Sequence, residues 1–247
     1  MNREEIRKMA EMEDRHWWFR GSRSVILSIL HPLLPRGLPL LDIGCGTGLT
    51  LARLEHACHL PPTALFGVDR STEALAAARR KTSASLSEGH AENLPHPDGS
   101  FGVVMLLDVL EHLLDDAAAL AEASRVTRPG GHVLVTVPAH PRLYSAHDRA
   151  LGHCRRYRRD EVVALASRAG LRVVRLTPYN CLLAPPIVLA RLGRRLARTP
   201  DPESDLRMPA GPVNRLLASL LACEARLLRC GNLPFGISFL GLFQKVS

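Results

Sequence analysis

The chain has 247 residues, a hydrophobic fraction of 46% and a formal net charge of +8 at pH 7. This length suits one elaborated domain with a substantial core. A basic balance is typical of nucleic-acid binding, but only Lys8, Lys81 and Lys245 are lysines. Nearly all of the positive charge comes from arginine, in a chain that is also rich in Ala, Leu and Pro. We therefore attribute the net charge to overall composition and expect no nucleic-acid partner.

The six cysteines form no C-x-x-C pair, and none has a histidine at zinc-finger spacing. We therefore expect free thiols in a reducing compartment and no metal site. No stretch reaches the ~18 uncharged apolar residues that span a bilayer, and the N-terminus does not resemble a signal peptide. These features predict a cytoplasmic protein.

Residues 1–36 are predicted to form an N-terminal helical cap. Ile6, Met9 and Met12 recur at helical spacing within residues 2–15, and a second helix is expected at 25–34, ended by prolines. Apolar strands and helical segments then alternate. Strands are expected at 38–43, 64–68, 83–87, 101–107, 132–137 and 172–177, and helices after Thr47 and at 71–81, 115–126 and 159–169.

This alternation predicts an α/β fold with parallel strands joined by right-handed crossovers, a doubly wound sheet. Ser71 is a good N-cap, and the glycine pair at 130–131 is expected to end a helix abruptly. The predicted domain comprises residues 37–180 and 234–247, with a last strand at 237–246.

Residues 181–233 are predicted to be a helical insertion before the last strand. Two apolar segments rich in arginine, 182–198 and 213–229, flank a linker rich in Pro and Asp. A lid or an oligomer contact is the favoured role, in a monomer or homodimer. An apolar face with arginines is also typical of a helix on an anionic membrane surface, which is the less favoured alternative.

The loop at residues 41–48 is the most informative part of the chain. An apolar run stops in three glycines at alternate positions, Gly44, Gly46 and Gly48. Glycine tolerates positive φ and lets a ligand approach the backbone, and a following helix N-terminus adds N–H donors. Asp69 ends the next strand, where a carboxylate suits a ribose diol. The pattern G-x-G-x-G differs from the dinucleotide pattern G-x-G-x-x-G, and no Walker lysine follows.

Five segments resemble, in order, the class I S-adenosylmethionine-dependent methyltransferases: residues 41–48, 67–69, 91–104, 107–112 and 128–131. Residues 16–23 are similar to bacterial small-molecule members of the methyltransferase-11 and ubiquinone-biosynthesis type. The resemblance covers roughly residues 15–180. It implies a Rossmann-like seven-stranded sheet, mostly parallel with an antiparallel last strand, and S-adenosyl-L-methionine as the cofactor.

The resemblance also implies a set of cofactor-binding residues. They are Asp42, Gly44, Cys45, Gly46, Gly48, Asp69, Arg70, Ala91, Glu92, Leu107 and Asp108, with Trp18 and Arg20 closing the pocket together with Phe19 and Arg23. Related chains often carry Asp where this chain has His90, so the adenine contact is expected to pass to Glu92 or to backbone.

Residues 147–157 are the candidate acceptor segment, because ligands bind at the carboxyl edge of such sheets. His147 and His153 are predicted as the catalytic base, with His147 favoured because Asp148 is adjacent. The predicted substrate-binding residues, for an anionic acceptor group, are Tyr144, Arg155, Arg156 and Tyr157. The alternative is a salt-bridged lid, with methyl transfer by proximity alone.

The predicted reaction is methylation of a small organic acceptor in a biosynthetic pathway, with O-methylation favoured over N- or C-methylation. Residues 107–110 lack the (Asp/Asn)-Pro-Pro-aromatic tetrad of enzymes that methylate base amino groups. Two alternatives stay open: a membrane-peripheral or scaffolding protein that binds the cofactor without turnover, and a methyltransferase acting on a lipid-linked or macromolecular acceptor.

Overall fold

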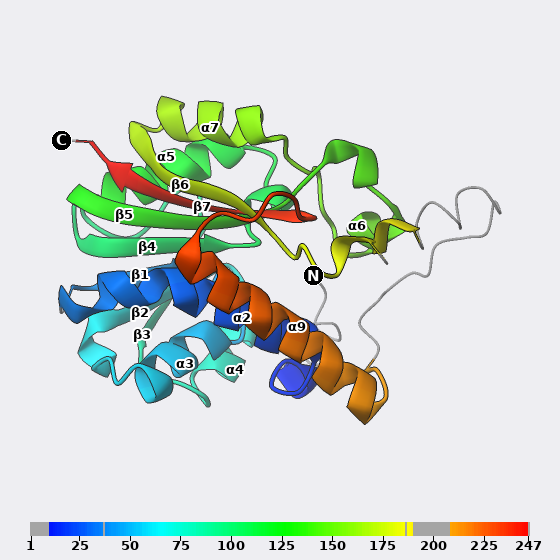
Figure 1. The fold of residues 1–247 in the computed structure, drawn as a ribbon. Coiled ribbons are helices and arrows are strands. Elements are labelled where there is room, and N and C mark those ends of the chain that lie inside the picture. The colour runs from blue at the N-terminus through cyan, green and yellow to red at the C-terminus, as the bar shows by residue number, and fades with distance from the viewer. Residues whose placement is uncertain (1–9, 37, 186, 190–207, 247) are drawn as a thin grey trace.

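The computed structural model describes residues 10–36, 38–185, 187–189 and 208–246. Its centre is a seven-stranded sheet in the order β3-β2-β1-β4-β5-β7-β6 (Figure 1). The strands are β1 (Leu40–Ile43), β2 (Leu65–Asp69), β3 (Ser85–Glu88), β4 (Phe101–Leu107), β5 (Thr127–Pro138), β6 (Leu171–Tyr179) and β7 (Ser238–Lys245). The pairs among β1 to β5 are parallel, and β7 is antiparallel to both β5 and β6. The predicted fold class is confirmed.

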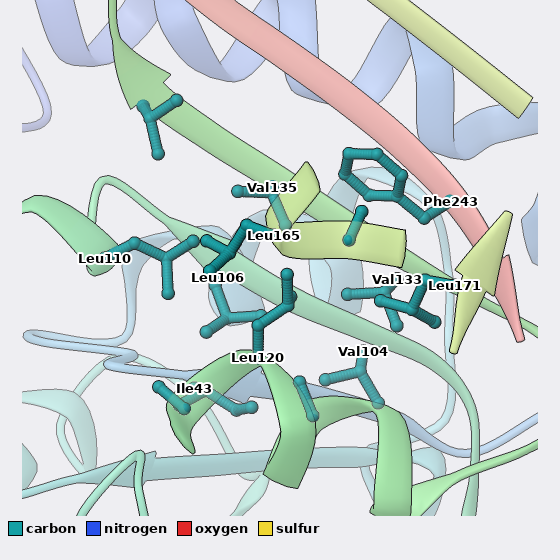
Figure 2. Packing of buried hydrophobic residues seen from close by; sticks show 14 of the residues in the cluster. Ile43, Val104, Leu106, Leu110, Leu120, Val133, Val135, Leu165, Leu171 and Phe243 are labelled. Carbon is teal, nitrogen blue, oxygen red and sulfur yellow. The ribbon is translucent and has the colours of Figure 1, made fainter. Parts of the chain in front are cut away.

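Helices cover both faces of the sheet (Figure 1). On one side lie α5 (Asp116–Val126) and α7 (Arg159–Arg168); on the other lie α2 (Trp17–Leu30), α3 (Leu49–Ala57), α4 (Thr72–Ala78) and α9 (Gly211–Cys230). Alternate strand residues face opposite sides. In β4, Val104 and Leu106 join the cluster beneath α5 and α7 (Figure 2), whereas Val103 and Met105 join the other cluster. A sheet buried on both faces explains the near-continuous apolar strands.

Two predicted boundaries were wrong. Helix α2 begins at Trp17 rather than at residue 25, because the side chain of His16 caps it by accepting a hydrogen bond from the Trp18 N–H. Strand β5 begins at Thr127 and includes the glycine pair, with Gly130 at φ +72°. The helix α5 therefore ends before that pair, where the Thr127 hydroxyl donates to the Ala123 carbonyl.

Other boundaries agree closely with the sequence predictions. Strand β4 spans the predicted residues, Ser71 caps α4 by accepting from the Ala74 N–H, and β7 is antiparallel as expected. None of the six cysteines is in a disulfide. The predicted helix at 2–15 lies mostly outside the described residues, as does most of 182–198.

Helix α9 of the insertion packs along α2 (Figure 1), and a Cβ at Gly21 of α2 would collide with Leu221 of α9. The Asn214 side chain accepts from the Trp17 N–H at 2.9 Å and donates to the Arg15 carbonyl at 2.7 Å. The N-terminal cap and α9 thus form one helical layer. Within the described ranges, no helix has both the length and the apolar character to traverse a bilayer.

Candidate functional site

The loop between β1 and α3 holds three glycines in the left-handed region, at φ +69° for Gly44, +54° for Gly46 and +77° for Gly48. The N–H groups of Gly44 and Cys45 both donate to the Val68 carbonyl, at 2.7 and 3.1 Å, which fixes the loop against the end of β2. A Cβ would lie 2.6 Å from a Val109 methyl at position 44 and 2.7 Å from the Ala78 Cβ at position 48. These two positions require glycine for both conformation and space.

Asp69, at the end of β2, faces this loop. Its Oδ2 accepts from the Gly46 N–H at 2.8 Å, and its Oδ1 accepts from the Ser71 N–H at 2.8 Å. A carboxylate oxygen has two acceptor sites, so each oxygen retains one. The half-buried carboxylate therefore holds the glycine loop and keeps capacity for two further donors, such as a vicinal diol.

The segment after β3 reaches the same edge, because the Gly89 N–H donates to the Asp69 carbonyl at 3.2 Å. Ala91 packs against the core, Glu92 is half-buried and His90 is exposed. The segment that carries the predicted residues Ala91 and Glu92 thus starts beside the end of β2. The predicted Arg70 is exposed.

Asp42 and Cys45 are buried at the loop. Burial, and then the charge of Asp69, raise the pKa of Asp42 to about 8. Burial also raises the pKa of the Cys45 thiol, with the charges of Asp42 and Asp69 adding to the effect. Without a ligand the thiol of Cys45 is neutral and the carboxyl group of Asp42 is mostly protonated at neutral pH, and a cation bound beside Asp42 would favour its charged form.

Replacing Asp42 by Asn is expected to flatten the pH dependence of stability. Because the pKa of Asp42 is about 8 in the fold and about 3.9 in an unfolded chain, the native state retains a proton that the unfolded state has lost. Asp42 therefore reduces stability as pH rises from about 4 to about 8. Thermal unfolding of ligand-free protein should show Asp42→Asn gaining over wild type by a few degrees at pH 8, with a smaller gain at pH 5.

Asp98→Asn is the matched control, because the Asp98 side chain is 81% exposed. It should keep the wild-type dependence on pH. Parallel curves for wild type and Asp42→Asn would contradict the raised pKa.

The N-terminal cap is bonded to the glycine loop through Glu13. The Thr47 hydroxyl donates to the Glu13 carboxylate at 2.6 Å, and Lys81 forms an ion pair with the same buried group. Arg23 donates to the Glu13 carbonyl at 2.7 Å, and burial lowers the pKa of Arg23 to about 10. Arg23 thus acts inside the cap, on the backbone of Glu13.

The predicted Trp18 packs against the apolar cluster that includes α2 and α9, and Arg20 is exposed. Glu13, Thr47 and Lys81 were not identified from the sequence. Thr47 lies inside the glycine motif, and this position was the only local feature that could have indicated its role. The contact between Glu13 and Lys81 spans 68 positions, and no local pattern predicts it.

The end of β4 carries a second acidic cluster. Asp108 adopts φ +54°, uncommon for a residue other than glycine. Its N–H donates to the Thr136 hydroxyl at 2.9 Å, and that hydroxyl donates to Asp108 Oδ1 at 2.9 Å. Burial raises the pKa of Asp108. The preceding Leu107 is half-buried.

The short helix η3 (Leu110–His112) follows and presents Glu111 and His112. Glu111 is 1% exposed, and burial followed by the charge of Asp108 holds its pKa well above the usual value. Burial, and then the nearby His153, lower the pKa of His112 to about 4. The His112 imidazole is therefore neutral at physiological pH. Both residues entered the sequence predictions only as part of the family resemblance.

Beyond β5, the chain forms η4 (Pro141–Leu143) and α6 (Ala146–Ala150), and Asp148 lies fully buried in α6. Asp148 Oδ1 accepts from Arg156 Nε at 2.7 Å and contacts His153 Nδ1 at 3.2 Å. Burial raises the pKa of Asp148, but the hydrogen bond from His153 and the charge of Arg156 outweigh it and hold the pKa below its usual range.

Asp148 thus orients His153, and the choice of His147 or His153 as the base stays a prediction. Successive helical residues point about 100° apart, and the Asp148 carboxylate contacts the His153 ring. His147 is a half-buried residue of α6. The His153 ring stands at 85° to the His112 ring, with 4.8 Å between centroids.

The four predicted substrate-binding residues hold this loop in place. Tyr144 donates to the His153 carbonyl at 2.7 Å, Arg155 to Asp116 at 3.1 Å, Arg156 to the Ala139 carbonyl at 3.2 Å and Tyr157 to Asp116 at 2.7 Å. Arg156 and Tyr157 are only 7% and 4% exposed. These contacts favour the alternative of a salt-bridged loop over binding of an anionic acceptor group.

Comparison with protein families matches residues 41–135 to a methyltransferase domain. Among curated proteins, the chain is 29% identical over 170 residues to a probable S-adenosylmethionine-dependent methyltransferase of Mycolicibacterium smegmatis, covering 68% of this chain and 64% of that protein. It is 32% identical over 159 residues to the ubiquinone biosynthesis O-methyltransferase of Pseudomonas aeruginosa, covering 57% of this chain and 65% of that enzyme. The chain thus spans somewhat less than two thirds of these relatives.

Among solved structures, the fold matches the methyltransferase partner in a complex with the Haloferax volcanii Trm112 methyltransferase activator. The TM-score is 0.63 at 21% identity, covering 96% of this chain and 92% of that one. At this identity the likeness supports the fold alone. The matched domain and the curated relatives show that the chain is similar to S-adenosylmethionine-dependent methyltransferases, with residues 41–135 matching a methyltransferase domain.

Proposed function

We propose that this protein transfers the methyl group of S-adenosylmethionine to an oxygen of a small organic acceptor. The observation that carries the proposal is the 2.8 Å hydrogen bond between the Gly46 N–H and Asp69 Oδ2, which sets a side-chain-free loop beside a carboxylate with spare acceptor sites. When bound, the cofactor supplies a methyl group activated by a sulfonium, so the protein has to orient the acceptor in line with the S–CH₃ bond.

The residues present fit this cofactor. Asp69 would accept from the ribose hydroxyls, Ala91 and Glu92 would contact adenine, and the loop glycines would let the backbone approach the ligand. Leu107 and Asp108 would flank the methionine end. Negative charge at Asp69 would favour the cationic cofactor over its neutral thioether product.

The acceptor is proposed to bind where Asp108, Glu111, His112 and His153 gather. A hydroxyl acceptor must lose its proton, and His153, oriented by Asp148 at 3.2 Å, is the better-supported group for this step. His147 remains the second proposed base. The name of the Pseudomonas aeruginosa relative supports oxygen as the acceptor atom.

A lipid-linked acceptor or a membrane surface is the second candidate. Helix α9 leaves Val213, Leu216 and Leu227 between 47% and 60% exposed, on a helix that also carries arginines. Co-sedimentation with anionic vesicles tests this candidate, and a protein that stays in the supernatant contradicts it.

Methyl transfer can be measured with S-adenosylmethionine labelled in the methyl group, using a panel of phenols and aliphatic alcohols. We expect label in the organic extract, and His153→Ala should lower turnover by about 10²-fold or more while cofactor affinity is kept. His147→Ala is the paired variant and should have a small effect. The reverse result would return the base role to His147, and label confined to macromolecules would overturn the small acceptor.

A further inference from the structure

Three side chains with metal-binding atoms converge beside the proposed acceptor position. Glu111, His112 and His153 each offer one ligand atom, and these atoms lie within 4.8 Å of one another. Ligands about 2.0–2.1 Å from a first-row cation lie roughly 3–4 Å apart. Side-chain movements on the order of 1 Å would therefore complete such a site.

The backbone builds this convergence. Glu111 and His112 are adjacent in η3, directly after β4, whereas His153 follows α6. The Cys154 N–H donates to the Glu111 carbonyl at 2.7 Å, and the His153 N–H donates to the Asp148 carbonyl at 2.8 Å. The first bond joins the residue after His153 to η3, and the second joins His153 to α6.

The buried Oε2 of Glu111 is an independent indication that a ligand binds at this position. Its side chain is 1% exposed, and within the part of the chain that the structure describes, no hydrogen-bond partner reaches the buried Oε2. Leaving a buried carboxylate oxygen without a donor or cation is costly. The nearby guanidinium of Arg156 donates instead to Asp148 and to the Ala139 carbonyl.

His153 has the environment of a metal ligand. Its Nδ1 contacts the buried carboxylate of Asp148 at 3.2 Å, which leaves Nε2 to face a cation. A carboxylate on the far nitrogen is the usual support of a metal-bound histidine, because it fixes the tautomer and the ring orientation. Asp148 is itself held by Arg156 and by the Ser145 N–H.

We propose that Glu111, His112 and His153 bind one divalent first-row cation that coordinates the acceptor oxygen. Two imidazoles and one carboxylate suit Zn²⁺, Mn²⁺, Fe²⁺ or Co²⁺ better than Mg²⁺ or Ca²⁺, which prefer oxygen ligands. Three protein ligands leave positions open for substrate. The sequence predicts no metal site, because zinc-finger spacing is absent. The candidate site could not be read from local spacing, because its third ligand comes from a separate loop.

This inference rests on the proposed function and refines the role of His153 from proton acceptor to ligand. A hydroxyl bound to the cation loses its proton to solvent, because the cation stabilises the alkoxide or phenolate. An oxygen lone pair then forms the bond to the methyl carbon, while the S–CH₃ bonding pair stays on sulfur as a neutral thioether. The atoms and charges balance without a protein base.

The test is calorimetric titration of chelator-treated wild-type protein with Mn²⁺, repeated with Zn²⁺ and Mg²⁺, without cofactor or acceptor. We expect one equivalent of Mn²⁺ or Zn²⁺ to bind, with Mg²⁺ at least tenfold weaker. Glu111→Gln and His153→Ala should each weaken binding by 100-fold or more. Glu111→Gln is nearly isosteric and replaces the ligand oxygen of a buried carboxyl group by an amide, so it should remain folded by circular dichroism.

Two control variants exclude stray binding. His56→Ala removes an exposed histidine of α3, and Cys154→Ser removes the exposed thiol beside His153. Both should bind Mn²⁺ as wild type does. Absence of stoichiometric binding, or affinity unchanged in Glu111→Gln and His153→Ala, would overturn the site.

Different results would contradict the metal site and the proposed function. Methyl transfer that continues at the wild-type rate after chelation would overturn the role of the cation and leave the proposed function intact. Failure to bind S-adenosylmethionine would overturn the proposed function whatever the metal titration gave. The expected result is transfer that falls at least 10²-fold after chelation and returns with Mn²⁺ or Zn²⁺.

Discussion

Asp69→Ala should weaken S-adenosylmethionine binding by at least about 100-fold. A hydrogen bond to a charged group contributes about 1.5–3 kcal/mol, and Asp69 offers the ribose two such acceptors. Losing both corresponds to at least about 3 kcal/mol, or two orders of magnitude in affinity. The variant also removes the acceptor of the Gly46 and Ser71 N–H groups, which loosens the loop. Isothermal titration with the cofactor and with its demethylated product measures the effect.

Asp98→Ala provides the comparison, because it removes a carboxylate that is 81% exposed and lies in the loop before β4. It should bind the cofactor as wild type does. An Asp69→Ala protein that keeps its affinity would remove Asp69 from the site and, with it, the main support for the cofactor position.

Gly46→Val should abolish cofactor binding while the domain still folds. Residue 46 has φ +54°, so any side chain there costs about 1–2 kcal/mol in backbone strain, and a branched Cβ would occupy the face that the ligand approaches. Gly170→Val is matched to it, since Gly170 has φ +70° and a Cβ added there would meet nothing within 4 Å.

Both valine variants should melt several degrees below wild type, and Gly170→Val alone should retain binding. Gly46→Ala is the milder variant if Gly46→Val does not fold. Equal losses of affinity at positions 46 and 170 would show that strain, rather than blocked approach, explains the effect.

Local pattern predicted much of the fold. Strand β4 is a run of seven residues with little polarity, and its limits could be read directly. The start of α2 could not be predicted, because it depends on the His16 side chain as a cap. Glycine is also unfavourable inside a helix, but Gly21 is needed in α2 because only a small residue fits against Leu221. The start of β5 was missed because glycines that usually end a helix here lie inside a strand.

The cofactor half and the acceptor half of the site also differ in how far local sequence predicts them. The cofactor half is encoded within short segments, since the glycines and Asp69 follow consecutive strands of one sheet. The acceptor half depends on contact between distant segments, η3 and the loop after α6. The cofactor half includes one contact of this kind, between Glu13 and Lys81. Sequence order placed His147 beside Asp148, whereas the turn of α6 directs Asp148 to His153 and Arg156.

A crystal structure of the wild-type protein grown with the demethylated product, S-adenosylhomocysteine, would show where the cofactor binds. We expect the ribose hydroxyls within hydrogen-bond distance of Asp69, the backbone of Gly44 to Gly48 against the ligand, and the sulfur directed towards Asp108 and His153. A ligand bound elsewhere, or crystals that show none at saturating concentration, would contradict this expectation.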